Sequence, residues 1–483
     1  MLQLLLGGSG SGKTTLLYQR IRARAEKGKK SILLVPEQFT SSTEGRIYRE
    51  LGDALSGMVE SFSFTSLAEK ILSTEGGAAV QTLSDAGRAV LVRRALEELQ
   101  DNVHYYHRHR RSAAFCQMAA QTIDELKSAG LSGRQLAQLA GACGAESGKL
   151  SELALIFQGY ETLLARSGMD PSDRLELAGA RLEEALARHS LPEFLRDRAV
   201  FIDEFDTFNA PKKRLLGAML AALPSVTVAL CDDGAPLLPG DLSLFSGAKQ
   251  VAAQLRQLAR KNGAEVAVPQ LLRKDLRHRN APGLAAVAEL LETGSCTADA
   301  PAGEVRLFAA PSREEEARAA AGAIRRLMRQ GVRCGKIAVV CRDIAKYRAA
   351  VRYEFRMAEI PLYCDEPTTP EFSAPATAVR ALLEIARGAD LTENLTTLAK
   401  TGLCALSEEQ VCALENYAYT WAPTAAAWRE KFERSPKGFG EQELTEEDLR
   451  NRERAEHARA LLVGAVDAFR AKVRGVNAEA ISR

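Results

Sequence analysis

A glycine-rich stretch near the start of the chain constrains its fold more than any other feature. Residues 7–14 read Gly-Gly-Ser-Gly-Ser-Gly-Lys-Thr and match the P-loop pattern GxxxxGK[ST] in full. The apolar run Leu2–Leu6 precedes this pattern, and a helical stretch from Lys13 to about Ala25 follows it. A strand, a glycine-rich turn and a helix in this order are typical of a parallel α/β sheet with a phosphate-binding loop. The sequence therefore predicts binding of a nucleoside triphosphate.

Each residue type in the loop has a chemical task. The glycines let successive backbone N–H groups turn inward toward phosphate oxygens. Lys13 would reach the β- and γ-phosphates, where it would also act catalytically, and the Thr14 hydroxyl would ligate Mg²⁺. ATP and Mg²⁺ are therefore the expected ligands. We expect the nucleotide to be bound by Gly7, Gly8, Ser9, Gly10, Ser11, Gly12, Lys13, Thr14 and Thr15.

A second motif supplies candidate catalytic carboxylates. Residues 199–204 read Ala-Val-Phe-Ile-Asp-Glu, which is the form of a Walker B strand. Asp203 would hold Mg²⁺ together with Thr14, and Glu204 would orient and deprotonate the attacking water. An acidic pair after a strand is common by itself. Its position downstream of a complete P-loop favours the catalytic interpretation.

Two weaker features concern DNA and the γ-phosphate. His107-Arg108-His109-Arg110-Arg111, preceded by Tyr105 and Tyr106, is the densest basic cluster with aromatic neighbours. It has the chemistry to contact phosphates or to stack on bases, but a solvated helix end explains it equally well. Arg342 follows the expected strand Ile337–Cys341 and would reach the γ-phosphate from a second domain, whereas such an arginine is more often a plain surface residue.

Composition sets the broad class. With 483 residues the chain is long enough for several domains, and its formal net charge of +2 indicates no global attraction to polyanions. No apolar run approaches the roughly 20 residues of a membrane span, so we expect no membrane contact and a cytoplasmic protein. The nine cysteines contain no CxxC pair and fit neither a zinc site nor an iron–sulfur run.

Several segments together resemble the AddB family. Its members are one of the two subunits of the bacterial AddAB ATP-dependent helicase–nucleases. The resemblance covers essentially the whole chain and keeps the order of the motifs. Besides the P-loop, it is carried by Val35-Pro36-Glu37-Gln38-Phe39-Thr40, Ser61-Phe62-Ser63-Phe64, Ile202-Asp203-Glu204-Phe205, Ile360-Pro361 followed by Asp365, Lys400-Thr401-Gly402-Leu403 and Leu414-Glu415-Asn416-Tyr417.

The resemblance implies a UvrD-like helicase fold, which is an α/β architecture of two RecA-like P-loop domains with mainly helical inserted domains. We expect a first RecA-like domain whose two parts flank a helical insertion, then a linker, a partial second RecA-like domain and a truncated second insertion. The expected boundaries are 1–80 (first domain, P-loop part), 81–195 (helical insertion), 196–280 (first domain, Walker B part), 281–300 (linker), 301–390 (second domain) and 391–483 (second insertion).

Function also follows from the resemblance. It implies a heterodimer with an AddA-like subunit. The heterodimer would process double-stranded DNA ends in recombinational repair and would also bind single-stranded DNA. Family members carry a nuclease and an iron–sulfur cluster in a C-terminal region, and neither is expected in this chain, which ends inside a helical segment. Glu204 departs from many members, which have a non-acidic residue there, and this difference favours hydrolysis.

Two functional hypotheses remain open at this point. The first is a DNA-translocating ATPase, favoured by Glu204. The second is a structural, Chi-recognising DNA-binding subunit whose P-loop binds ATP without driving translocation, favoured by the missing last helicase motifs. A transporter ATPase is excluded because Leu55-Ser56-Gly57, the only hint of its signature, lies too close to the P-loop. A small-molecule kinase would not need a second α/β unit.

Overall fold

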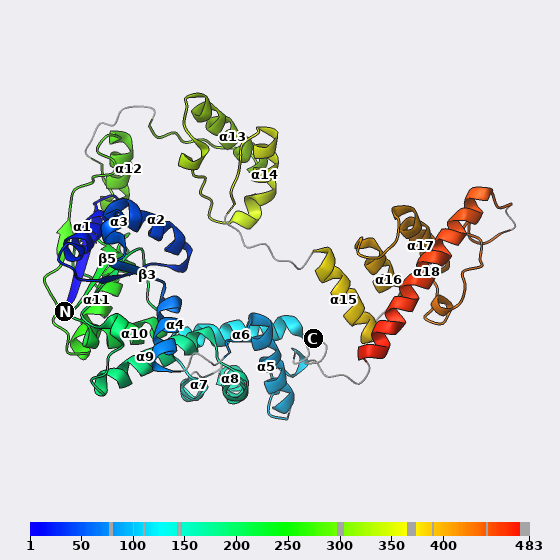
Figure 1. Ribbon diagram of the computed structural model, residues 1–483, viewed down its shortest axis with the longest axis horizontal. Coiled ribbons are helices and arrows are strands. Elements are labelled where there is room, and N and C mark those ends of the chain that lie inside the picture. Colours follow the sequence, from blue (N-terminus) through cyan, green and yellow to red (C-terminus); the bar gives the residue numbers. More distant parts are fainter. Residues whose placement is uncertain are drawn as a thin grey trace. The chain divides into compact units, whose positions relative to one another are not determined.

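The computed structural model describes residues 1–76, 81–99, 101–109, 112–142, 144, 147–296, 304–364, 373–388, 391–440 and 443–473. One sheet, which Figure 1 shows among the helices of the N-terminal part, contains six strands in the order β3-β2-β4-β5-β1-β6, and every pairing is parallel. The α/β class with a parallel sheet is thereby confirmed. The strands are β1 (Leu2–Gly7), β2 (Ser31–Leu34), β3 (Val59–Phe62), β4 (Ala199–Ile202), β5 (Ser225–Cys231) and β6 (Gln270–Leu272).

Both faces of the sheet are buried, which explains why its strands are apolar runs and not alternating patterns. Leu2, Leu4 and Leu6 of β1 enter the core on one face, and Leu5 enters the core on the other. The first face is covered by α4 (Phe64–Glu75), α9 (Pro171–Ala187), α10 (Ala210–Ala222) and α11 (Ser246–Lys261). The second is covered by α1 (Lys13–Ala25), α2 (Thr40–Leu51) and α3 (Asp53–Ser56).

The strand bounds differ from expectation at one place. The segment Ser61–Phe64 by itself predicts a third strand, but β3 ends at Phe62. Ser63 instead caps α4, because its hydroxyl accepts the backbone N–H of Ser66 while the Ser66 hydroxyl accepts the N–H of Ser63. Such a reciprocal capping box competes with strand extension. The short strand β6 was not indicated by any pattern.

The helical insertion has a hydrophobic core of its own. That core is built from α5 (Asp85–Glu98), α6 (Ala113–Ser128), α7 (Gly133–Ala140) and α8 (Ser147–Ser167). Ser84 precedes a helical pattern and is predicted to cap a helix; its hydroxyl does cap α5, accepting the N–H of Gly87 at 3.2 Å. The helix α9 also lies in the expected insertion, 81–195, yet its Leu175, Ala178 and Leu182 pack into the core of the sheet.

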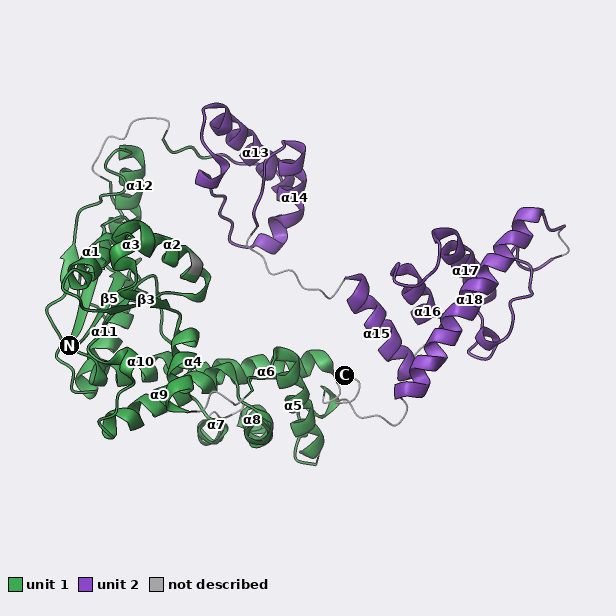
Figure 2. Cartoon of the chain, in the orientation of Figure 1, with its two compact units in different colours: residues 1–307 green, residues 308–483 purple. Residues whose placement is uncertain are grey.

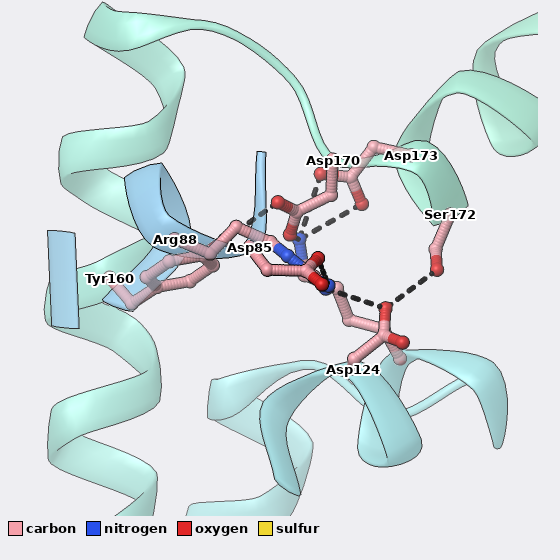
Figure 3. Close-up of polar contacts among 8 residues, drawn as sticks. Asp85, Arg88, Asp124, Tyr160, Asp170, Ser172 and Asp173 are labelled. Carbon is pink, nitrogen blue, oxygen red and sulfur yellow. Dashed lines mark hydrogen bonds and ion pairs between the residues drawn. The ribbon is translucent and has the colours of Figure 1, made fainter. Parts of the chain in front are cut away.

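A buried polar network joins the insertion to the start of α9 (Figure 3). The Lys127 amine contacts carboxylate oxygens of Asp170 and Asp173, each at 2.8 Å. The Tyr160 hydroxyl donates to Asp170 at 2.6 Å, and Asp170 is only 1% exposed. Arg88 pairs with Asp85 and Asp124 in the same network, and Ser172 donates to Asp124. These contacts tie α5, α6 and α8 to the helix that returns to the sheet.

Residues 1–307 and 308–483 form two compact units (Figure 2). The range 281–300 was expected to be a linker. It contains the helix α12 (Pro282–Thr293), which belongs to the first unit. The Pro282 at the first helical position and the left-handed Gly294 after the last one explain its bounds.

The apolar runs Val305–Ala309 and Ile337–Cys341 predict the strands of a second α/β unit, and the structure corrects this expectation. The helices α13 (Arg313–Arg329) and α14 (Ile344–Met357) pack on each other, but Val305–Ala309 and Ile337–Cys341 have no strand conformation. A short turn at Cys334–Lys336 precedes the latter segment. Within the described residues neither segment has a pairing strand, and their apolar side chains, such as Leu307 and Val340, are exposed. A strand needs a neighbour for its backbone hydrogen bonds.

The C-terminal helices form a separate core around the buried Trp428. They are α15 (Ala374–Ala386), α16 (Leu391–Lys400), α17 (Glu408–Trp421) and α18 (Glu446–Val473). The boundary expected at residue 390 placed α15 with the second α/β domain, whereas Ala378, Ala381 and Ile385 pack with the helical part. In the part of the chain that the structure describes, no helix has the length and apolarity to cross a membrane.

Candidate nucleotide-binding site

The glycine-rich loop lies where β1 ends and α1 begins. Gly10 and Gly12 adopt φ values of +81° and +89°, a region that residues with a Cβ atom rarely occupy. A Cβ atom on Gly10 would also lie 2.7 Å from the Cβ of Arg277. The Ser11 hydroxyl is buried and has no hydrogen-bond partner. The loop therefore has the shape that the pattern predicts, with a polar atom left to be satisfied.

Lys13 directs its amine into the loop. The Nζ atom donates hydrogen bonds to the carbonyl oxygens of Gly7 at 2.7 Å and of Gly8 at 2.8 Å. Burial lowers the pKa of Lys13, while the neighbouring Cys231 and Asp203 act in the opposite direction. The Lys13 amine therefore lies inside the loop, where the motif predicts that it binds phosphate.

Asp203 meets the P-loop because β4 and β1 end at the same edge of the sheet, with β5 between them. Its backbone N–H donates to the Leu34 carbonyl at 3.1 Å, which extends the pairing with β2 by one residue. The Thr14 side chain lies next to the Asp203 carboxylate, so the two expected metal ligands lie together. Burial raises the pKa of Asp203, and the neighbouring Thr14 side chain, the Glu204 N–H and Lys13 oppose the increase.

Glu204 takes an uncommon backbone conformation at the edge of the site. Its φ is +65°, and its N–H donates to Asp203 Oδ1 at 3.1 Å. Desolvation and the Asp203 carboxylate raise the pKa of Glu204, although the residue is exposed on the outer side. The next residue, Phe205, packs edge-on against Phe64 and stacks with Phe208, with ring centroids at 5.2 and 5.5 Å. This aromatic packing holds the turn that presents Glu204.

The residues present fit a nucleotide with Mg²⁺. A threonine hydroxyl and a carboxylate are hard oxygen ligands of the kind that Mg²⁺ prefers, and Mg²⁺ at such sites takes its other ligands from phosphates and water. Among the described residues there is no group of three or more His, Cys, Asp or Glu arranged for a metal ion. One threonine and one carboxylate agree with a metal that depends on the nucleotide for much of its coordination.

Three residues near the loop were not anticipated from the sequence. After β6 the chain crosses the P-loop, where the Leu276 N–H donates to the Gly10 carbonyl at 3.0 Å and Arg277 Nη1 to the Ser9 hydroxyl at 3.3 Å. The Glu292 carboxylate of α12 lies against Gly8, since a Cβ atom on that glycine would be 2.5 Å from Oε1. No motif in residues 270–292 signals this contact. It depends on the pairing of β6 with β1.

The remaining predicted site residues belong to other parts of the fold. Arg342 is exposed just before α14, in the second unit. Tyr105 and His107–His109 are on the surface of the insertion, where the Glu152 carboxylate accepts the backbone N–H groups of residues 104–106. Arg110 and Arg111 lie outside the described residues.

Comparison with known proteins decides the family. A family model described as "ADDB, N-terminal" matches residues 4–288, more than half of the chain. The chain belongs to the AddB family. The match includes the loop, the acidic pair and the whole insertion, so the AddB-type sequence and the site described above coincide.

Curated relatives extend the similarity beyond the matched domain. Two AddB-type proteins, each named as the B component of an "ATP-dependent helicase/deoxyribonuclease", come from Desulforudis audaxviator and Symbiobacterium thermophilum. They are 32% and 31% identical over 446 and 455 residues, which cover 88% and 89% of this chain but 37% and 38% of the relatives. The protein of the same name from Clostridium perfringens is 27% identical over 489 residues, covering 98% of this chain and 42% of the relative. The chain thus spans about two fifths of these AddB proteins.

Proposed function

We propose that this chain is the helicase-like, N-terminal portion of an AddB protein that binds and hydrolyses ATP with Mg²⁺. The observation that carries the proposal is the meeting of the P-loop with the acidic pair. The Thr14 side chain lies next to the Asp203 carboxylate, and Glu204 is held beside Asp203 at the outer edge of the same site. A phosphate-binding loop, a buried carboxylate and a more exposed second carboxylate are the groups that phosphoryl transfer to water requires.

The residues divide the work of hydrolysis. The backbone N–H groups of the loop and Lys13 bind the phosphates, and Arg277 lies close enough to add a second positive charge. Mg²⁺ held by Thr14 and Asp203 would neutralise charge on the β- and γ-phosphates. Glu204 accepts a proton from the attacking water while the oxygen of that water forms a bond to the γ-phosphorus. The bond from that phosphorus to the β–γ bridging oxygen breaks, and ADP leaves with the bond's electron pair.

The wider role follows from the names of the relatives. We infer that an AddA-like subunit is the partner and that the complex processes double-stranded DNA ends for recombinational repair. The exposed Tyr105 and the His107–His109 turn offer a stacking group and a positive charge to DNA. We infer that the nuclease, and the iron–sulfur cluster that the AddB resemblance implies for full-length members, belong to the region that this chain does not match.

The alternative is a DNA-binding subunit that binds ATP without driving translocation. The Glu292 carboxylate lies against Gly8, and a negative charge beside the loop opposes triphosphate binding in either function. Slow or absent turnover with intact nucleotide binding would agree with this second function, and Arg342 would then have no catalytic task.

The deciding experiment measures binding and turnover separately. The chain is titrated with ATP and ADP in the presence of Mg²⁺, and phosphate release is then followed with blunt DNA, with single-stranded DNA, and with an added AddA-type subunit. Mg²⁺-dependent binding with DNA-stimulated release is expected. Binding without release under every condition supports the alternative, and absence of binding contradicts both functions.

A further inference from the structure

The helix α12 brings an acidic side chain to the phosphate-binding loop. After β6 the chain crosses the loop and enters α12, whose last turn carries Glu292. All three atoms of the Glu292 carboxylate lie within 3.2 Å of the point that a Cβ atom on Gly8 would occupy. The Lys13 amine donates a hydrogen bond to the carbonyl oxygen of the same Gly8 at 2.8 Å. An acid of α12 and the lysine of the loop therefore meet at one residue.

The position of Glu292 on its own helix is unfavourable. The last turn of a helix carries a partial negative charge, and α12 has no basic residue in that turn. The cation of the loop offsets this cost. No direct ion pair joins Lys13 and Glu292 in the part of the chain that the structure describes, so their attraction acts across Gly8. An attraction of this kind is weak enough for an incoming polyanion to overcome.

The rest of α12 is lightly packed. Its buried residues are Gly283 and Ala286, and four of its apolar side chains are exposed, namely Leu284, Val287, Leu290 and Leu291. A segment with few buried apolar contacts opens at a low cost in free energy. The attraction at Glu292 is therefore a large part of what holds the last turn of α12 in place.

The first turn of α12 is anchored separately. The Gly283 N–H donates to the Glu304 carboxylate at 2.6 Å, and a Cβ atom on Gly283 would lie 2.8 Å from the same Oε2 atom. This contact and the two buried residues are far from Gly8 along the helix. Loss of the attraction at Glu292 would therefore free the last turns of α12 and leave its first turn attached.

We propose that α12 is a nucleotide-responsive latch, in which Glu292 holds the last turn on the loop by attraction to Lys13 and the phosphates of a bound nucleotide displace it. The inference rests on the proposed function and names a regulation of the same site. A triphosphate brings several negative charges to Lys13 beside the Glu292 carboxylate, and like charges at short range repel each other. Lys13 then attracts the phosphates, and the last turns of α12 leave the loop.

Hydrogen exchange of the α12 backbone amides tests the latch directly. Inorganic tripolyphosphate is the probe, because it supplies the charge of a nucleotide tail without base or sugar. In the parent it should speed exchange in the last turns of α12 about threefold or more. The first turn of α12 should change less, and the core helix α10 should not change. Unchanged or slower exchange in the last turns of α12 with the anion bound overturns the proposal.

Removing the charge of the latch should have the same effect as the anion. Glu292→Gln without tripolyphosphate should exchange as fast in α12 as the parent does with it, and the anion should then add little. Glutamine has nearly the same size and helix propensity as glutamate, so faster exchange reports the lost charge and not a weaker helix. The matched control is Glu26→Gln, an exposed change at the far end of α1, which should behave like the parent. Parent-like exchange in Glu292→Gln, or equal acceleration in both variants, overturns the proposal.

A double variant tests whether Lys13 is the partner of the latch. Lys13→Met keeps much of the side-chain volume but removes the charge, so it should also speed exchange in α12. The variant with both Lys13→Met and Glu292→Gln should exchange no faster than the faster single variant, because each change removes the same attraction. Two effects that multiply in the double variant would show independent causes and overturn the proposal.

Calorimetry separates the latch from the proposed function. ATP with Mg²⁺ and tripolyphosphate are titrated into the parent and into Glu292→Gln. Binding of either ligand to Glu292→Gln but not to the parent would support a latch that closes the loop. If neither ligand binds to either protein, the proposed nucleotide binding fails, and the exchange rates without anion decide whether Glu292 holds α12. Equal rates in the parent and Glu292→Gln overturn the latch.

Discussion

The backbone N–H of Glu204 donates a hydrogen bond of 3.1 Å to the Oδ1 atom of Asp203, while Glu204 adopts a φ of +65°. For a residue with a Cβ atom this conformation costs about 1–2 kcal/mol. It persists because the hydrogen bond and the packing of Phe205 against Phe64 hold the turn. The strain directs two neighbouring carboxylates to different environments, one buried against Thr14 and one at the open edge of the site.

Glu204→Gln should abolish most ATP turnover and leave nucleotide affinity within about twofold of the parent. The amide keeps the size of the side chain but cannot accept the proton from water, and positioned general bases contribute about 10²–10⁴-fold. Phosphate release and nucleotide titration measure the two quantities. Glu193→Gln, an exposed change elsewhere in the first unit, is the control. If Glu204→Gln hydrolyses ATP as fast as an active parent, Glu204 is not the base.

Lys13→Ala should weaken ATP binding more than ADP binding. The change removes the one full positive charge inside the loop, and a charge-assisted contact of this kind corresponds to about tenfold to a hundredfold in affinity. Calorimetric titration with each nucleotide in the presence of Mg²⁺ gives the ratio of ATP affinity to ADP affinity. The exposed Lys29→Ala should leave it unchanged, and DNA binding should keep its salt dependence in both variants. Equal ATP affinity in Lys13→Ala and parent would show that the loop does not hold the triphosphate.

Glu292→Gln should tighten ATP binding about threefold to tenfold at low salt. Its carboxylate lies against Gly8, where it repels an incoming triphosphate, and the amide removes the charge at nearly constant volume. The gain should shrink as the salt concentration rises, because the side chain is exposed and the repulsion is screened. The gain in ATP affinity is measured by titration at two ionic strengths. Glu26→Gln, at the far end of α1, is the control. A salt-independent or absent gain contradicts the electrostatic explanation.

Lys127→Met should destabilise the first unit by about 3–5 kcal/mol. Methionine fills a similar volume but leaves Asp170 and Asp173 without the cation that they share, and breaking a buried ion pair from one side has this cost. Urea unfolding followed by circular dichroism gives the free energy. Arg93→Met, which breaks the exposed pair with Glu97, should stay within about 1 kcal/mol of the parent. Similar losses in both variants would show that the buried network is not special.

The same network predicts a loss of stability at alkaline pH. Burial alone would lower the pKa of Lys127, but Asp173 and Asp170 outweigh it and the pKa is raised above its ordinary 10.5. The pKa of Lys127 is higher in the folded than in the unfolded protein. Its ion pairs therefore contribute fully to the free energy of unfolding below pH 10.5, and this contribution is lost as the pH rises through the folded pKa. Unfolding free energies measured between pH 10 and pH 12 should show a steeper alkaline loss in the parent than in Lys127→Met.

Much of the local structure could be anticipated because its causes are local. The strand–loop–helix order around Gly7–Thr14 follows from an apolar run, glycines that tolerate positive φ, and a helical stretch with nothing to stop it. The same holds for the cap at Ser84 and for the buried strand before Asp203. In each case neighbouring residues supply both the hydrogen bonds and the conformational preference.

Expectations failed where a segment depends on a partner that lies elsewhere in the chain. Ile337–Cys341 has the apolar composition of a strand, but strand structure requires a neighbour to accept its backbone hydrogen bonds, and composition cannot supply one. In the same way, α9 lies within the range expected for the insertion yet packs on the sheet, against α10 and α4.

The sequence by itself therefore determined the fold class, the loop and the identity of the acidic pair, since each is written in adjacent residues. Only the tertiary structure decided which distant groups meet. Three such contacts arise from the order of the parallel strands and the packing of helices on the faces of the sheet. They are the contact of Thr14 with Asp203, the crossing of Arg277 over the loop, and the position of Arg46 beside Tyr18. That order is a property of long-range pairing, which short-range patterns do not specify.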